Sequence, residues 1–468
     1  MKKISDLYNI DNDTLVKDIK INSKEVVEGD IFVCTMGVTA DRHDFVNEAV
    51  KKGAKLIVAS KEIDVDVPVA YVENTNKELI SLAKKVYDYD ESLKLIGVTG
   101  TNGKTTVALM IKHLLGNDTG YMGTNGIISN SFNEMIRNTT PDADRLYKYF
   151  KRFKEDNCQN IVMETSSESF YRNRLDGLDF GIGILTNITE DHLNIHKTIE
   201  NYVDCKMDLF RKVKKDGFCI LNIDDNYYDL ALKNSNGKVL TYGKKESTLQ
   251  IVDYKIYVDK TEITLKYNDK LYSFVSPFIG EVNVYNITSS ILACLALGKD
   301  IDGLVEKVPD IPKVGGRLDC LDTKTDYKVI LDYAHTLDAF KKIIPFLNSV
   351  KENRLTVITG AAGGRQQDKR PLIGNYLLNN VDEVIFTMDD PRYEDPLKII
   401  YEMIGNSKNE NYKIIVDREF AIKEAFDNAK PGDIILIAGK GIDNYMVIAD
   451  KYIPYSDVEI IDNYFGNR

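Results

Sequence analysis

The ten residues GVTGTNGKTT, 97–106, constrain the fold of this chain more than any other stretch. An apolar run, LKLIGVT, precedes them and a helix-like stretch, TTVALMIKHLL, follows, which predicts a strand that turns into a helix. Glycines at such a turn let backbone N–H groups point toward an anion, and the N-terminus of the helix attracts it further. We therefore expect a phosphate-binding loop formed by Gly100, Thr101, Asn102, Gly103, Lys104, Thr105 and Thr106.

The loop departs from the usual spacing G-x-x-x-x-G-K-[ST], because Val98 stands in the place of the first glycine. Lys104 is expected to reach the β- and γ-phosphates of a nucleotide, and Thr105 to hold Mg²⁺. The alternative is an ordinary strand-to-helix turn that binds nothing. The strand before the turn, its two glycines and the Lys-Thr-Thr sequence favour the phosphate loop.

Composition narrows the classes of function. The chain has 468 residues, a net charge of -11 and no basic block, so we do not expect nucleic acid as a partner. Six cysteines are spread singly without a C-x-x-C pair, which argues against a zinc ribbon and favours a reducing compartment. The start lacks an apolar leader, and no run of about 18 apolar residues follows. We expect a cytoplasmic monomer that binds no membrane.

The order of apolar runs predicts an α/β fold with three domains. Residues 1–90 alternate short apolar runs with helix-like stretches, typical of a small α/β domain. Residues 91–311 contain near-continuous apolar runs such as NIVMET, which suit a parallel sheet. Within them, residues 248–278 alternate apolar and polar side chains, which suggests antiparallel strands. Residues 283–298 predict a helix. IPKVGGRLD, 311–319, predicts a hinge. Residues 312–468 predict a Rossmann-like doubly wound domain with ligands at the carboxyl ends of its strands.

The loop is similar to the ATP loop of the Mur ligases, which add amino acids to the peptidoglycan precursor, and of folylpolyglutamate synthases. The similarity continues along nearly the whole chain, in the order that the family has. It resembles most the Mur ligases that add the third peptide residue to UDP-N-acetylmuramoyl-L-alanyl-D-glutamate. The matching motifs are NTTPDADRLYKYF (138–150), METSSESF (163–170), LTNITEDHLNIHKTIENYVDCKMDLF (185–210), NVYN (283–286), GGRLD (315–319), LDYAHTLDAF (331–340), GAAGGRQQDKRPLIG (360–374) and DDPRYEDP (389–396).

The resemblance implies that ATP phosphorylates a carboxylate and that an amine then displaces the phosphate. Such a transfer needs positioning and charge neutralisation more than covalent help from the protein. The resemblance gives catalytic roles to Lys104, Glu164, His192 and Lys206. Glu164 and His192 would hold Mg²⁺ with Thr105, and so would Lys206 once it is carbamylated, which requires a neutral amine. From the residues alone, His192 could instead be a capping or core histidine, and Lys206 a surface lysine on a helix.

The resemblance also divides the binding residues among the three domains. Domain 1–90 would bind the UDP substrate, 91–311 would bind ATP, and 312–468 would bind the incoming amino acid. Asn286, Arg317, Asp332 and His335 would contact the nucleotide. Ser23, Asn138, Thr139, Thr140, Ser166 and Arg174 would contact the muramoyl-peptide substrate. Arg365, Asp389, Asp390, Pro391, Arg392, Gly439 and Asp443 would bind the incoming amino acid. Asn286 and Ser166 could instead be helix caps or turn residues, and Arg392 a surface arginine.

Arg392 points to the donor. A guanidinium can bind a carboxylate with two parallel hydrogen bonds, and family members that use meso-2,6-diaminopimelate carry arginine in this motif. The sequence departs from the family at substrate positions: NSK (22–24) replaces D-S-R, Asp390 replaces asparagine, Glu168 replaces histidine, and GKGID replaces GKGHE with Ile442 and Asp443. The departures leave the ATP and metal residues intact. A ligase that uses L-lysine, a paralogue or folylpolyglutamate synthase-like enzyme, and a catalytically silent ATP-binding partner protein stay as alternatives.

Overall fold

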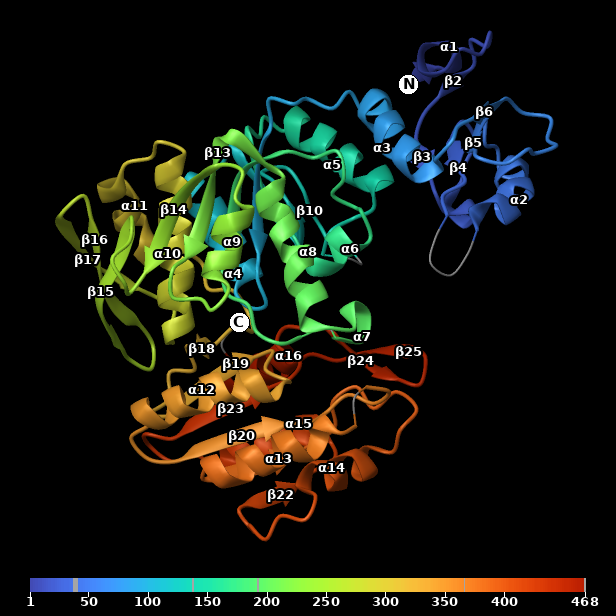
Figure 1. The fold of residues 1–468 in the computed structure, drawn as a ribbon. Coiled ribbons are helices and arrows are strands. Elements are labelled where there is room, and N and C mark those ends of the chain that lie inside the picture. The colour runs from blue at the N-terminus through green and yellow to red at the C-terminus, as the bar shows by residue number, and fades with distance from the viewer. Residues whose placement is uncertain (37–40, 137–138, 192, 366, 467–468) are drawn as a thin grey trace. The chain divides into compact units, whose positions relative to one another are not determined.

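The computed structural model describes residues 1–36, 41–136, 139–191, 193–365 and 367–466. Contacts within the chain define two compact units, Met1–Leu249 with Ser289–Lys299, and Gln250–Thr288 with Asp300–Arg468. Figure 1 shows the helices and strands in chain order. The predicted domain boundaries at 90/91 and 311/312 stay a prediction.

The chain begins with a small parallel sheet. Its strands, in order across the sheet, are β3 (Ile19–Lys20), β4 (Ile31–Val33), β5 (Leu56–Ala59) and β6 (Val69–Tyr71). Phe32 and Ile57 are fully buried, as the apolar runs around them predict. The small α/β arrangement expected here is confirmed. The other elements are β1 (Lys2–Lys3), α1 (Ile4–Leu7), β2 (Leu15–Val16), α2 (Val46–Lys51) and α3 (Thr75–Val86).

A larger, mostly parallel sheet follows in the same unit. Its parallel strands, in order across the sheet, are β8 (Thr119–Gly123), β11 (Asn160–Glu164), β7 (Lys94–Thr99), β12 (Phe180–Leu185), β13 (Val213–Asn222) and β14 (Lys238–Gly243). Strands β9 (Gly126–Ile128) and β10 (Asn133–Glu134) continue it beyond β8 in antiparallel pairing. The predicted parallel sheet is confirmed. The helices between these strands are α4 (Lys104–Leu115), α5 (Ala143–Glu155), α6 (Ser167–Tyr171), α7 (Leu193–His196), α8 (Ile199–Arg211) and α9 (Tyr228–Asn234).

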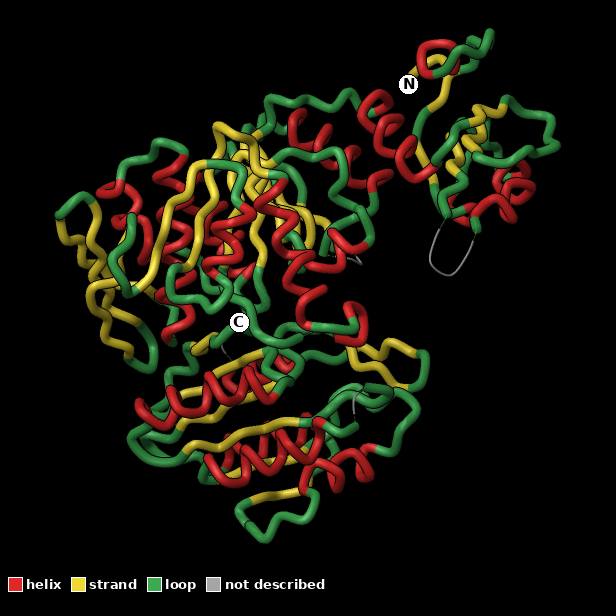
Figure 2. The backbone as a smooth tube through the Cα atoms, in the orientation of Figure 1, coloured by secondary structure: helices red, strands yellow, loops and turns green. Residues whose placement is uncertain are grey.

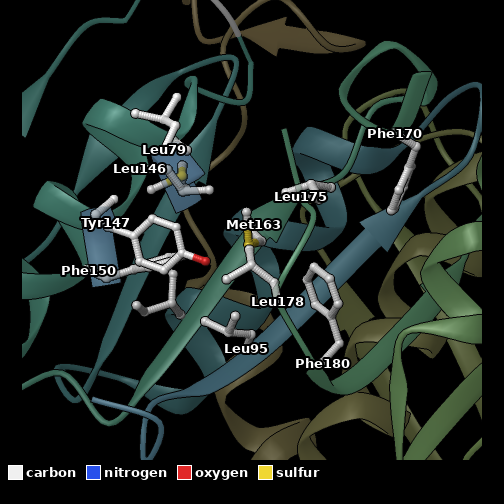
Figure 3. Packing of buried hydrophobic residues seen from close by; sticks show 14 of the residues in the cluster. Leu79, Leu95, Leu146, Tyr147, Phe150, Met163, Phe170, Leu175, Leu178 and Phe180 are labelled. Carbon is white, nitrogen blue, oxygen red and sulfur yellow. The ribbon is translucent and has the colours of Figure 1, made fainter. Parts of the chain in front are cut away.

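Helix α5 packs its apolar side against this sheet. Its buried residues include Leu146, Tyr147 and Phe150, a spacing of three and four that places them on one side of a helix. Figure 3 shows them packed in one cluster with Leu95 of β7 and Met163 of β11. Removing this apolar area from water stabilises the sheet by roughly 25 cal/mol per Å². The packing thereby fixes the carboxyl ends of β7 and β11, where the predicted phosphate loop and Glu164 lie.

The second unit contains a three-stranded antiparallel segment and the first part of a long helix, whose residues from Ser289 onward belong to the first unit. Strands β15 (Leu249–Ile256), β16 (Thr261–Tyr267) and β17 (Lys270–Ser276) pair antiparallel, as the alternation over 248–278 predicts. Helix α10 (Glu281–Ala296) confirms the helix predicted at 283–298, and α11 (Ile301–Lys307) follows it. No helix among the described residues is both long and apolar enough to cross a membrane.

The last part of the second unit is a doubly wound sheet. Its parallel strands, in order, are β19 (Lys328–Asp332), β23 (Ile434–Ala438), β20 (Leu355–Thr359), β21 (Glu383–Phe386) and β22 (Tyr412–Ile414), and β18 (Asp319–Leu321) pairs antiparallel with β19. Its helices are α12 (Leu337–Val350), α13 (Lys369–Asn380), α14 (Pro396–Ile404), α15 (Arg418–Asp427) and α16 (Asp457–Phe465). A hairpin of β24 (Tyr445–Ile448) and β25 (Lys451–Pro454) completes it.

Alternating residues of this sheet belong to two separate cores. Along β23, Leu436 packs with the residues of α12, α13 and α14, while Ile435 and Ile437 pack with those of α15 and α16. Successive side chains of a strand point to opposite faces, so helices cover the sheet on both sides. Figure 2 shows these helices alongside the strands. The Rossmann-like architecture predicted for this region is confirmed.

A buried ion pair ties three elements of this sheet together. Arg418 begins α15 and Asp457 begins α16, and both side chains are fully buried. The guanidinium donates to both carboxylate oxygens, at 2.9 Å from Nε and 2.8 Å from Nη2. Nη2 also donates to the carbonyl of Ala438, at the end of β23. The pair therefore holds the strand end that leads into the predicted donor residue Gly439.

Removing one partner of this pair is expected to destabilise the second unit strongly. Asp457→Ala leaves the guanidinium of Arg418 buried without its counter-ion, which costs about 3–5 kcal/mol in the free energy of unfolding. Glu459→Ala, an exposed position on the same helix, is the matched control and is expected to change that free energy by less than about 0.5 kcal/mol. Urea unfolding followed by circular dichroism measures both. Equal stability of the two variants would contradict this account.

Candidate active site

The predicted phosphate loop joins β7 to α4 in a conformation that needs glycine. Gly100 and Gly103 have φ of +147° and +87°, and a Cβ at Gly100 would lie 1.9 Å from the hydroxyl of Thr186. Asn187 accepts from the backbone N–H groups of the loop, with its carbonyl 2.7 Å from Thr101 N and its Oδ1 3.1 Å from Asn102 N. The segment after β12 thus holds the loop in shape. Sequence reasoning quoted this segment but missed Thr186 and Asn187.

Two lysine side chains meet at one carbonyl of this loop. Lys104 Nζ donates to the carbonyls of Gly100 and Thr101, both at 2.9 Å. Lys206 Nζ, from α8, donates to the same Gly100 carbonyl at 2.7 Å. The structure therefore brings together two of the predicted catalytic residues, which are 102 positions apart in the chain by the difference of their numbers, around a loop built to bind an anion.

Lys206 is not a surface lysine. Its side chain is about 1% exposed, and its Nζ lies 4.4 Å from the centre of the Tyr202 ring. Burial lowers the pKa of Lys206 well below its usual range, and the positive charge of Lys104 lowers it further. The environment thus favours the neutral amine, the form that can react with carbon dioxide.

Glu164 lies in a cradle of hydroxyl and backbone donors at the end of β11. Its Oε1 accepts from the hydroxyl of Tyr121 at 2.6 Å and from Thr124 N at 2.9 Å. Its Oε2 accepts from the hydroxyls of Thr105 at 3.0 Å and Thr124 at 3.2 Å. A Cβ at Gly123 would lie 2.2 Å from Oε1, so glycine is required beside the carboxylate. Sequence reasoning found Glu164 and Thr105 but missed Tyr121 and Thr124.

The donor set at Glu164 fits Mg²⁺. No group of three or more histidine, cysteine, aspartate or glutamate residues that could hold a metal occurs among the residues with described positions. Mg²⁺ does not need one, because it commonly binds one or two carboxylates together with waters and substrate phosphates. The carboxylate of Glu164 and the hydroxyl of Thr105, 3.0 Å apart, supply such hard oxygen ligands next to the phosphate loop.

Two of the predicted acceptor residues, Thr139 and Thr140, lie close to Glu164 or to its partner Thr124. The hydroxyl of Thr140 donates to the backbone carbonyl of Glu164 at 3.0 Å, and that of Thr139 lies 3.4 Å from Thr124 Oγ1. Arg174 donates to Asp142 at 2.7 Å.

Two further predicted substrate residues, Ser166 and Ser23, have other positions. Ser166 caps α6 by accepting from Ser169 N, as its alternative reading expected. Ser23 is buried and donates to Glu48 at 2.7 Å. His192 and Asn138 lie outside the described residues.

The predicted nucleotide contacts of the second unit have partners of their own. Asp332, at the end of β19, accepts from the backbone N–H groups of Leu318 and Ala334, both at 2.7 Å, and burial raises its pKa. Its place in an apolar strand is thus explained without a ligand. Two exposed side chains, Arg317 and His335, have contacts with Tyr333. Arg317 lies 4.8 Å from the centre of the Tyr333 ring, and His335 Nδ1 lies 2.7 Å from the Tyr333 carbonyl.

Asn286 lies inside α10 and is therefore not the helix cap considered above. Its side chain is buried, and its Nδ2 donates to Asn283 Oδ1 at 2.8 Å.

The predicted donor residues gather around a buried lysine that sequence reasoning missed. Lys440 is about 1% exposed and donates to Asp390 at 2.8 Å, with Asp389 and Asp443 at 3.8 and 3.9 Å. Gly439 has φ +111°, and a Cβ there would lie 2.7 Å from Asp389 Oδ2. Burial raises the pKa of Asp443. The position of a lysine two residues after β23 was the only signal in the sequence.

Arg392 stands apart from these carboxylates. It has φ +54°, and its Nε is buried without a hydrogen-bond partner. No ion pair joins Arg392 to an acidic residue in the part of the chain that the structure describes. It borders a cavity of about 340 Å³, next to Gly364. Arg365 is exposed, and Pro391, which precedes Arg392, is buried. A guanidinium so placed is available to an external carboxylate.

The glycine loop, its lysine and the buried carboxylate define a P-loop nucleotide-binding protein. The chain matches the family descriptions "Mur ligase family, catalytic domain" over residues 15–99, "Mur ligase middle domain" over 98–294 and "Mur ligase, glutamate ligase domain" over 316–441. It therefore belongs to the Mur ligase family, whose members are ATP-dependent ligases. The predicted α/β class and the three-domain architecture are confirmed.

Relatives of known function cover nearly the whole chain. A UDP-N-acetylmuramoyl-L-alanyl-D-glutamate--2,6-diaminopimelate ligase of Bacillus cereus is 35% identical over 457 residues, 95% of this chain and 93% of the relative. A ligase of the same name, numbered 1, from Clostridium acetobutylicum is 36% identical and covers 96% and 94%. A solved structure of a ligase of this name superposes with a TM-score of 0.71 at 27% identity, covering 100% and 99%.

The glycine beside Glu164 gives a test of the site's geometry. Gly123→Ala would push the carboxylate of Glu164 out of its cradle, and we expect Mg²⁺-dependent ATP affinity to fall about tenfold or more. Gly181→Ala, in the same sheet, is the control, because a Cβ there meets only Leu95 O at 3.6 Å. Calorimetric titration with and without Mg²⁺ measures both variants. Unchanged affinity in Gly123→Ala would show that Glu164 is not a metal ligand.

Proposed function

We propose that this chain is an ATP-dependent ligase that joins meso-2,6-diaminopimelate to UDP-N-acetylmuramoyl-L-alanyl-D-glutamate through an acyl phosphate, in peptidoglycan precursor synthesis. The observation that carries the proposal is the cluster of Lys104, Thr105, Glu164 and Thr140, which joins a phosphate loop, a metal carboxylate and a predicted acceptor contact. The printed names of the relatives at 35 and 36% identity support the choice of substrates. We place the reaction in the cytoplasm, with the chain as a monomer.

In this proposal the first unit activates the acceptor carboxylate. Thr105, Glu164 and His192 would hold Mg²⁺, which would neutralise the negative charge of the phosphates when bound. Lys104 would exchange the Gly100 and Thr101 carbonyls for phosphate oxygens and stabilise the charge that develops on transfer. The loop residues 100–106 would surround the phosphates with backbone N–H groups, and Asn286, Arg317, Asp332 and His335 are kept as proposed nucleotide contacts.

Lys206 would act after its amine has bound carbon dioxide. The neutral amine, which burial favours, attacks the carbon of carbon dioxide and loses one proton, so that the side chain becomes a carbamate anion. The carbamate keeps one N–H at Nζ, so it can still donate to the Gly100 carbonyl, which the amine contacts at 2.7 Å. Carbamylation would therefore place an anion that can hold metal beside the cation of Lys104.

The remaining predicted residues would hold the two substrates. Ser23, Asn138, Thr139, Thr140, Ser166 and Arg174 are proposed for the UDP-muramoyl dipeptide. Arg365, Asp389, Asp390, Pro391, Arg392, Gly439 and Asp443 are proposed for the incoming amino acid. Arg392 would bind the distal carboxylate of diaminopimelate, because it lacks an acidic partner among the described residues. Asp443 would accept the distal ammonium group.

A different donor is the second candidate. Asp390 in place of asparagine and Asp443 in place of glutamate put three carboxylates around Lys440, an arrangement that also suits a donor whose side chain ends in an ammonium group alone. L-lysine is such a donor.

A catalytically silent ATP-binding protein is a further alternative, and it would bind nucleotide without releasing phosphate.

A substrate panel tests the function directly. Purified protein receives UDP-N-acetylmuramoyl-L-alanyl-D-glutamate, Mg-ATP and single amino acids, and phosphate release is measured. We expect turnover that needs both acceptor and amino acid, with kcat/KM for meso-diaminopimelate at least about tenfold above that for L-lysine, because Arg392 discriminates for the distal carboxylate. Faster turnover with L-lysine would favour the second candidate. ATP binding without amine-dependent phosphate release would contradict a ligase.

Arg392→Ala separates donor binding from nucleotide binding. We expect the KM for meso-diaminopimelate to rise at least about tenfold, since a charge-assisted bidentate contact is lost, while the ATP affinity stays within about twofold. Lys408→Ala, an exposed cation of the same unit, is the control and should leave both values unchanged. If Arg392→Ala instead lost nucleotide binding, the donor assignment would be wrong.

A further inference from the structure

The hairpin β24–β25 is fastened to the turn that carries Arg392. Arg392 N donates to the Val447 carbonyl at 3.0 Å, and Ala449 N donates to the Arg392 carbonyl at 2.7 Å. Val447 N also donates to Asp390 Oδ1 at 2.9 Å. The turn and the hairpin thus form one hydrogen-bonded surface, which lets residues of the hairpin act on whatever Arg392 binds.

The cavity of about 340 Å³ lies along this junction. Arg392, Tyr393, Val447, Ala449, Asp450 and Tyr452 line it, together with Gly364 and Glu394. The Glu394 carboxylate already has hydrogen-bond partners. It accepts from Gly364 N, from Arg370 Nη1 at 2.7 Å and from Arg370 Nη2 at 3.0 Å. Arg392 is the one cationic side chain in this lining, and its buried Nε lacks a partner. The cavity therefore suits an anionic group attached to an apolar chain.

Two tyrosines form the walls of the cavity. Tyr393 is 74% exposed and Tyr452 is 70% exposed, although both border the cavity. The Tyr393 hydroxyl donates to Asp450, which joins the turn to the tip of the hairpin. Tyr452 packs edge-on against Tyr445, with 5.0 Å between ring centres. Exposed aromatic rings held in place beside an unpaired guanidinium are typical of a surface that binds a ligand.

We propose that Tyr393 and Tyr452 determine specificity for the donor amino acid, by enclosing the methylene groups of its side chain while Arg392 binds its distal carboxylate. This proposal rests on the ligase function proposed above and adds to it the hairpin, from which no predicted site residue came. The hydrogen bond from Tyr393 to Asp450 holds the Tyr393 ring at the edge of the cavity. A donor that ends in an ammonium group would meet Arg392 without a compensating charge, since Asp450 and Glu394 are already engaged.

Steady-state kinetics of point variants test the proposal. We expect Tyr393→Ala and Tyr452→Ala each to raise the KM for meso-diaminopimelate about tenfold, and to leave the KM for ATP within about twofold. Tyr393→Phe, which removes only the bond to Asp450, should raise the donor KM by a smaller factor. Tyr401→Ala is the matched control, because Tyr401 is 61% exposed on α14 and does not line the cavity. Donor KM values equal to that of the control would overturn the proposal.

A binding measurement tests the role of the two tyrosines independently of whether the chain is a ligase. The chain contains no tryptophan, so Tyr452→Trp and the control Tyr401→Trp each carry a single reporter. Both proteins are titrated with meso-diaminopimelate and with L-lysine, in the presence of the acceptor and a non-hydrolysable ATP analogue. A saturable emission change at position 452 with meso-diaminopimelate, and none with L-lysine or at position 401, supports the proposal even where turnover fails. Turnover of meso-diaminopimelate by the wild type without an emission change overturns the proposal and leaves the ligase function standing.

Discussion

The backbone of residues 100–103 is the constraint on which the site of the first unit depends. Gly100 has no room for a side chain because the Thr186 hydroxyl would lie 1.9 Å from a Cβ, so its carbonyl stands open to Lys104 and Lys206. The same turn starts α4 at Lys104 and thereby places Thr105 3.0 Å from Glu164. One sterically fixed turn thus brings together Lys104, which we propose to bind phosphate, the proposed metal ligands and Lys206.

Two lysines are buried among the residues that the structure describes, and their electrostatic surroundings differ. Lys206 and Lys440 are each about 1% exposed. Lys206 donates to a carbonyl near the positive charge of Lys104, and burial lowers its pKa, which favours the neutral amine. Lys440 instead has three carboxylates within 4 Å, which compensate a buried positive charge and hold the donor residues together.

The sequence predicts those parts of the structure that depend on local pattern. The strands β7, β11 and β12 follow from apolar runs, and the phosphate loop follows from its glycines and Lys-Thr-Thr sequence, while the role of Glu164 comes from the family resemblance. Tyr121, Thr124 and Lys440 could not be found in this way, because tertiary contacts alone bring them to Glu164 and Asp390. Asp332 is predicted to contact the nucleotide, but in the structure its carboxylate accepts from two backbone N–H groups of its own chain. The periodicity of apolar residues locates helices and strands, but it does not show which side chains from distant parts of the sequence bind the same carboxylate.

The account depends on the triphosphate binding at the loop. A crystal structure with Mg²⁺ and a non-hydrolysable ATP analogue tests this most directly, with the Lys104 side chain as the readout. The account predicts that Lys104 Nζ leaves the carbonyls of Gly100 and Thr101, where it now lies at 2.9 Å, and contacts phosphate oxygens while Thr105 and Glu164 share the metal. Nucleotide bound elsewhere, with both lysines still on the Gly100 carbonyl, would contradict it.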